Sequence, residues 1–147
     1  MKPDKFNFHK KIEALKRAKV DLPNDLAQSG QVYFQRNFNK QQWDGKKWDN
    51  VQRRIPGTKA YKYAKPTSNR VKPIGVLSGK LKQAMQNTVR EKTYKKIVWG
   101  VDLTYAKYFN FGTNKMASRK IMGGSKEMVS LMKRKINLSF NKVMFTK

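Results

Sequence analysis

The 147-residue chain has no cysteine and a single histidine, His9. Without cysteine, disulfide bridges and thiolate metal sites are excluded. One histidine without cysteine gives no basis for a zinc site or an acid–base triad, and the acidic residues show no paired spacing typical of hydrolases. The sequence therefore predicts a protein that is not an enzyme and needs no cofactor or metal.

Long apolar runs are also missing. No stretch of 18 apolar residues occurs, so we expect no membrane-spanning helix and no membrane partner. The absence of cysteine suits synthesis in a reducing cytoplasm.

Acidic residues are scarce, and this produces the most prominent feature of the sequence. The chain has 34 Lys and Arg against 9 Asp and Glu, a formal net charge of +25. Residues 50–90 and 128–147 contain no acid at all. Such an excess favours a polyanion or an acidic protein surface as partner. The alternative is a highly charged surface without a particular partner.

Apolar residues are nevertheless numerous enough for a folded body. They make up 38% of the chain, aromatic residues make up 12%, and the length suits a single domain over residues 1–147.

Hydrophobic spacing predicts helices near both ends of the chain. We expect one helix over 6–20 and another over about 23–41, separated at Pro23 because proline favours a first turn. A third helix is expected over 124–144, with an apolar stripe too wide for a solvated helix. The expected apolar face of the second helix comprises Leu26, Gly30, Tyr33, Phe34, Asn37 and Phe38.

The middle of the chain predicts a small antiparallel sheet. Residues 87–94 and 95–101 read as strands because of their β-branched and aromatic content. A short helix is expected to begin near Ser78. The fold class is therefore α+β, with N-terminal helices, a small antiparallel sheet, a long C-terminal helix and an extended basic arm.

Residues 52–75 are expected to form that arm or a long loop. The segment contains three prolines, few apolar residues and no acid. Its cations are candidates for assembly contacts or DNA contacts. They are Arg53, Arg54, Lys59, Lys62, Lys65, Arg70 and Lys72.

The sequence Gly123-Gly124-Ser125 precedes the last helix and has two interpretations. Its backbone N–H groups could bind an anion. The alternative, which we favour, is a hinge followed by a helix cap.

Four segments occur in an order that resembles a known family. They are QWDGKKW (42–48), LSGKLKQAM (77–85), VWGVDLTYAKYFNFGT (98–113) and MASRKIMGGS (116–125). Together they resemble the phage virion morphogenesis family, the tail-completion proteins of Mu-like phages, and the wider group of head–tail joining proteins. The family usually has proline before the arginine of the last segment, where this chain has Ala117-Ser118. The residues that carry the resemblance are Trp43, Trp48, Leu77, Gly79, Leu81, Gly100, Tyr105, Ala106, Phe109, Gly112, Arg119 and Gly123.

The resemblance implies a structural virion protein at the head–tail junction, in the neck or connector. Its implied partners are other virion proteins (portal or adaptor, tail tube or tail terminator), further copies of itself in an oligomer or ring, and genomic DNA in the channel. The alternative is a basic nucleic-acid-binding protein, since tyrosine and tryptophan alternate with Lys and Arg.

The segment YAKYFNFG also has two interpretations. The resemblance implies a short helix packed on the sheet, with Tyr105 and Phe109 in the core and Gly112 at a sharp turn. A base-stacking platform is the alternative.

Overall fold

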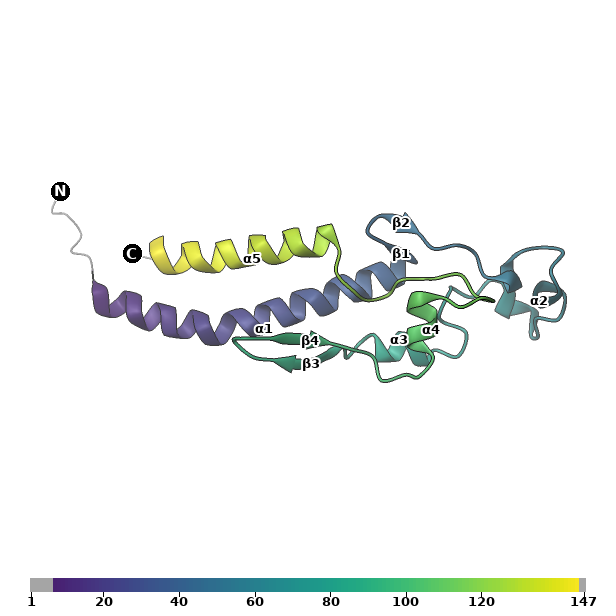
Figure 1. The fold of residues 1–147 in the computed structure, drawn as a ribbon, viewed down its shortest axis with the longest axis horizontal. Coiled ribbons are helices and arrows are strands. Elements are labelled where there is room, and N and C mark those ends of the chain that lie inside the picture. The colour runs from purple at the N-terminus through teal and green to yellow at the C-terminus, as the bar shows by residue number, and fades with distance from the viewer. Residues whose placement is uncertain (1–6, 146–147) are drawn as a thin grey trace.

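Two long helices run side by side along one half of the computed structural model, which describes residues 7–145 (Figure 1). They are α1 (Phe8–Lys40) and α5 (Lys126–Phe145). The elements between them are β1 (Gln42–Trp43), β2 (Lys46–Lys47), the 3-10 turn η1 (Gln52–Arg54), α2 (Lys59–Lys62), the 3-10 turn η2 (Thr67–Arg70), α3 (Lys80–Ala84), β3 (Val89–Lys92), β4 (Ile97–Trp99) and α4 (Ala106–Phe111).

The strands form two separate hairpins, and the α+β class is confirmed. In the first, Trp43 pairs with Lys46, and Asp44 and Gly45 both have positive φ (51° and 82°), as a two-residue hairpin turn requires. In the second, Val89 lies opposite Trp99. The turn of this second hairpin lacks glycine; Thr93 closes it by accepting the backbone N–H of Lys96 through Oγ1 (3.0 Å).

The N-terminal helices are one element, so the predicted break at Pro23 is wrong. Proline supplies no N–H to the preceding turn, but Asn24 Nδ2 donates to the Val20 carbonyl (3.3 Å) in the same region. Helix α1 is visibly bowed (Figure 1) and contacts both α5 and the β3–β4 hairpin. Packing on two sides thus retains a helix that the local sequence would interrupt.

The core lies where α1 meets the loops and short helices of the other half. The predicted α1 face is confirmed for its buried members, Gly30, Tyr33, Phe34, Asn37 and Phe38. The cluster of buried hydrophobic residues consists of Tyr33, Phe34, Phe38, Ile74, Leu81, Met85, Ala106, Phe109, Ile121 and Met128.

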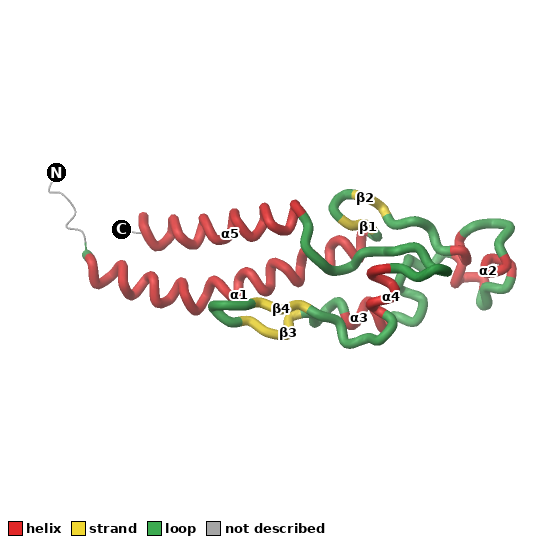
Figure 2. Tube along the Cα trace, viewed as in Figure 1, coloured by secondary structure: helices red, strands yellow, loops and turns green. Residues whose placement is uncertain are grey.

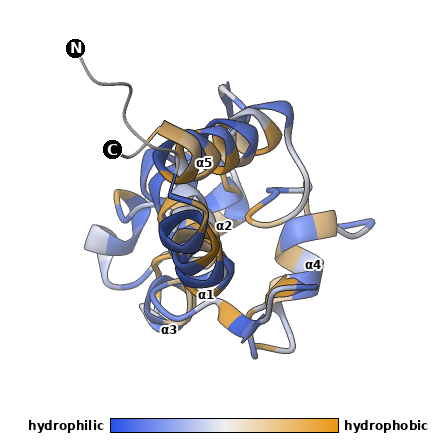
Figure 3. Ribbon diagram, turned by 90° about the vertical axis from the view of Figure 1, so that its left-hand side faces the viewer, coloured by the Kyte–Doolittle hydropathy of each residue, from blue (hydrophilic) through white to orange (hydrophobic). Residues whose placement is uncertain are grey.

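Helix α5 buries less than its sequence suggests. Only Met128 and Val143 are fully buried, while Val129, Leu138 and Phe140 are exposed. Hydrophobic and hydrophilic residues alternate along both long helices (Figure 3). Within residues 7–145, no helix combines the length and apolar character that a bilayer span requires.

Candidate functional site

Residues 52–75 form a folded projection, which we call the basic lobe, at the end of the molecule opposite the chain termini (Figure 2). Short helical turns occupy much of it, namely η1, α2 and η2. The Arg53 guanidinium holds these turns together by donating to the carbonyls of Asn69 (3.0 Å), Lys72 (3.2 Å) and Pro73 (3.1 Å). The prediction of an extended arm over residues 52–75 is therefore wrong. Hydrogen bonds from arginine side chains hold this segment in a folded form, although it has few apolar residues.

Arg70 plays the same internal part in the basic lobe. Its Nε donates to the Tyr61 carbonyl (2.9 Å), and its guanidinium lies 4.4 Å from the Tyr61 ring centroid. Planar cations commonly stack on aromatic faces in this way. Two of the seven predicted contact cations, Arg53 and Arg70, are thus engaged within the lobe itself.

The remaining cations differ in exposure. Lys59, Lys62 and Lys65 face solvent, whereas Arg54 and Lys72 are half-buried. Tyr63, 68% exposed, lies beside this surface, with Lys62 Nζ 5.8 Å from its ring centroid. Three lysines and one accessible aromatic ring therefore form one part of the lobe that can contact a partner.

Positive charge also accumulates at the base of the lobe. Burial, and then the charges of Arg54 and Arg119, lower the pKa of Arg53 below its ordinary value. Repulsion among three guanidinium groups is the reason for the second effect. The base of the lobe therefore concentrates positive charge.

Arg119 holds the loop that leads into the basic lobe. It is only 4% exposed and donates to the carbonyls of Asp49 (3.0 Å), Asn50 (3.0 Å) and Ala117 (3.2 Å). Burial lowers its pKa, and the charge of Asp49 partly opposes this. A guanidinium can satisfy three backbone acceptors at once, which explains why the loop before η1 stays in place.

Three of the four segments that carry the family resemblance contact one another next to this arginine. Trp48 Nε1 donates to the Lys120 carbonyl (3.0 Å), and the Trp48 ring meets Phe109 edge-on, with centroids 5.6 Å apart. Asn110 Oδ1 accepts the backbone N–H groups of Ile121 (2.7 Å) and Met122 (3.0 Å). Segments 42–48, 98–113 and 116–125 thus form one packed unit.

Gly112 makes a turn in this unit that no other residue would allow. Its φ is 79°, and an added Cβ would lie 2.8 Å from Ser118 N and 2.9 Å from Met116 O. Both are backbone atoms that cannot rotate away. The sharp turn predicted at this glycine is confirmed.

The other motif residues are divided between core and surface. Leu81, Ala106 and Phe109 are buried, as expected of core positions, whereas Leu77 is exposed. Tyr105, expected in the core, is 42% exposed, because α4 turns only one of its faces inward. The motif residues placed elsewhere are Trp43 (half-buried, stacked on Phe34), Gly79 (before α3), Gly100 (after β4) and Gly123 (exposed).

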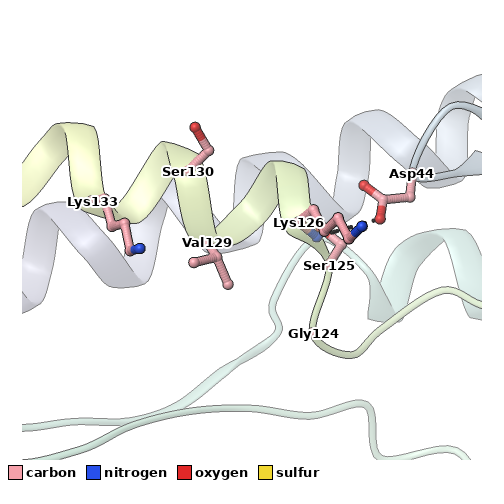
Figure 4. Close-up of a pocket in the computed structure, with 7 residues that line it drawn as sticks. All are labelled: Asp44, Gly124, Ser125, Lys126, Val129, Ser130 and Lys133. Carbon is pink, nitrogen blue, oxygen red and sulfur yellow. Dashed lines mark hydrogen bonds between the residues drawn. The ribbon is translucent and has the colours of Figure 1, made fainter.

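The first turn of α5 is capped by side chains. Ser125 Oγ accepts from Met128 N (2.9 Å), and the Asp44 carboxylate accepts from Glu127 N (3.4 Å). Asp44 also accepts from Lys126 N (3.4 Å), as Figure 4 shows. These contacts occupy the N–H groups that an anion would use, so the cap interpretation of Gly123-Gly124-Ser125 is confirmed. No local pattern in the sequence could have paired Asp44 with a helix that begins some 80 residues later.

Nowhere in residues 7–145 do three or more His, Asp or Glu side chains gather as metal ligands would. No protein-family model, curated protein or solved structure matches the chain.

Proposed function

We propose that the chain is a structural protein of a tailed-bacteriophage virion that acts at the head–tail junction, in tail completion or head–tail joining. The observation that carries this proposal is the packing of segments 42–48, 98–113 and 116–125 around Arg119. These are three of the four segments that resemble the phage family. Their mutual contacts support the proposal, since they place the three segments in one packed unit.

The mode of action is assembly rather than catalysis. Large apolar side chains face solvent outside the core, among them Phe111 (77% exposed) and Val71 (75% exposed). Surfaces of this kind dock other proteins, and repetition around a ring strengthens each weak contact. Neighbouring virion proteins such as a portal, adaptor, tail tube or terminator, and further copies of the chain, are the proposed partners. The protein would be made in the host bacterial cytoplasm and reside in the virion neck.

The test is to delete the gene from the phage genome that carries it and to examine the particles. We expect DNA-filled heads and separate tails, with joining restored by a plasmid copy. Quantitative mass spectrometry of purified wild-type particles should find the protein at a low, fixed copy number. Normal particles from the deletion, together with absence of the protein from wild-type virions, would overturn the proposal.

The second candidate is a nucleic-acid-binding protein. The exposed set Lys59, Lys62, Lys65 and Tyr63 favours it, because basic grooves with accessible aromatic rings bind single strands. Nucleic-acid binding by the purified protein at physiological salt, with particle joining unaffected by the deletion, would support this candidate over the first.

A further inference from the structure

A groove of about 640 Å³ opens between α1, α5 and the turn of the β3–β4 hairpin. Its location is distinct from the basic lobe, because it lies along the N-terminal part of α1 and the C-terminal part of α5. The apolar floor of the groove includes Leu15, Leu22, Leu26, Ile97, Ile136 and Phe140.

Several of these side chains are left in water. Leu15 is 50% exposed, Ile136 is 43% exposed and Phe140 is 56% exposed. The apolar spacing along α5 therefore continues past the area that α1 covers. A contiguous apolar strip of this kind on two helices is typical of a protein-docking surface.

The charged residues in the groove have one sign. Lys19, Lys95 and Lys96 are among the described residues that line it, and no Asp or Glu is. Lys19 Nζ lies 4.8 Å from the Tyr94 ring centroid, and Lys96 pairs with Glu91 at 2.7 Å. Lysines therefore flank an apolar floor.

We propose that this groove binds an amphipathic helical segment of another protein, with an apolar face for the floor and acidic residues for the lysines. The α1 side of the groove, from Leu15 to Leu26, is about 17 Å long at 1.5 Å per residue. A bound helix of about three turns has the same length. The inference goes beyond the proposed function, since it specifies the chemistry of a partner and holds wherever the protein acts.

Two other occupants fit less well. A second copy of this chain would bring a formal charge of +25 to a groove already flanked by lysines. A lipid chain would fill the floor, but the strip of exposed apolar residues extends beyond it, to Ile12 on α1 and Met144 on α5. A protein segment covers both the floor and this extension.

The probe is a fluorescein-labelled peptide of about 18 residues, with leucines spaced three and four apart and glutamates at the remaining positions. A scrambled peptide of identical composition, without an apolar face, is its matched control. Fluorescence anisotropy at about 0.15 M salt would measure both dissociation constants with the full chain. We expect the amphipathic peptide to bind at least about tenfold more tightly than the scrambled one.

Substitutions then locate the binding. Phe140→Ser and Leu15→Ser should each weaken binding of the amphipathic peptide about tenfold, because each removes an apolar contact. Val129→Ser and Val32→Ser, at exposed apolar positions on the same two helices outside the groove, should leave it unchanged. Lys95→Glu should weaken binding more than the matched change Lys133→Glu. The exposure of these residues predicts unaltered melting temperatures.

Three results would overturn the proposal. The first is equal affinity for both peptides, which would show attraction by net charge alone. The second is self-association of the free chain that Phe140→Ser abolishes, which would make a second copy the occupant. The third is groove-dependent binding to anionic phosphatidylglycerol vesicles with no peptide preference, which would make a lipid the occupant.

Discussion

Arg119 acts at the scale of a single residue, by holding loop segments together that regular secondary structure does not. Arg119→Met would leave the carbonyls of Asp49, Asn50 and Ala117 without this donor. We expect a loss of about 2–4 kcal/mol in the free energy of unfolding, measured by urea denaturation. Arg119→Lys should lose less, since it keeps the charge but not the planar fork. Arg134→Met, at an exposed position, should change stability by less than about 0.5 kcal/mol.

Tyr33 gives a pH dependence that can be assigned to one side chain. Burial raises its pKa above the ordinary value of 10.0, and the hydrogen bond with Ser125 (2.7 Å) partly opposes this. Below about pH 10 the Tyr33 hydroxyl is protonated in both the folded and the unfolded chain, so its full contribution to the free energy of unfolding is present. As the pH rises further, the unfolded chain loses its proton first, and stability falls until the folded-state pKa is passed.

Tyr33→Phe should therefore show a shallower loss of unfolding free energy above about pH 10 than the wild type. Urea denaturation in steps of pH would measure both slopes. The matched variant Tyr63→Phe changes an exposed ring and should retain the wild-type slope. Identical slopes for all three proteins would contradict the assignment to Tyr33.

At the scale of the elements, the β3–β4 hairpin packs closely against α1 at Gly30. Trp99 Nε1 donates to the Ala27 carbonyl (3.0 Å), and a Cβ at Gly30 would lie 2.5 Å from Trp99 Cζ2. Gly→Ala inside a helix usually gains about 1 kcal/mol. Here we expect Gly30→Ala to lose about 1–3 kcal/mol, because the indole must move. Gln28→Ala, at an exposed site on the same helix, is the control, and a stabilised Gly30→Ala protein would disprove the close packing.

The elements also show how far the sequence could be interpreted. Periodicity located the buried face of α1 and the extent of α5, since a helical stripe depends on residues close in sequence. It failed at Pro23, where contacts from distant elements support the helix. It also failed at the basic lobe, because guanidinium-to-carbonyl hydrogen bonds such as those of Arg53 leave no hydrophobic pattern. The groove needs three elements at once, and its one local signal is the wide apolar stripe of the last helix, to which Ile136 and Phe140 belong.

At the scale of the whole molecule, the question is whether the +25 charge serves DNA directly. Arg53 is engaged inside the basic lobe, so Lys59, Lys62 and Lys65 are the cleaner positions for substitution. If they contact phosphates, replacing all three by Gln should flatten the log–log salt dependence of duplex binding by up to about 2.7, at about 0.9 per contact. The loss of affinity should be the same for all DNA sequences, because phosphate contacts carry no sequence information.

The matched control replaces Lys133, Arg134 and Lys135 by Gln. These exposed residues lie on α5, outside the basic lobe, and the change in net charge is the same. We favour docking to an acidic protein, and then the lobe variant should bind DNA as the control does but fail to join particles. A salt titration and a particle-assembly assay separate these outcomes. Normal particles from the lobe variant would contradict a role for these lysines in either contact.

The length of α1 has a mechanical consequence. From Leu22, in the floor of the groove, to Lys40, near the basic lobe, the helix rises about 27 Å at 1.5 Å per residue. Two partners bound at these places would not collide, and each would be held at a fixed separation from the other by a rod rather than a tether. The chain would then behave as a spacer of set length, because the core residues that α1 buries between these two places fix the helix against α5 and the β3–β4 hairpin.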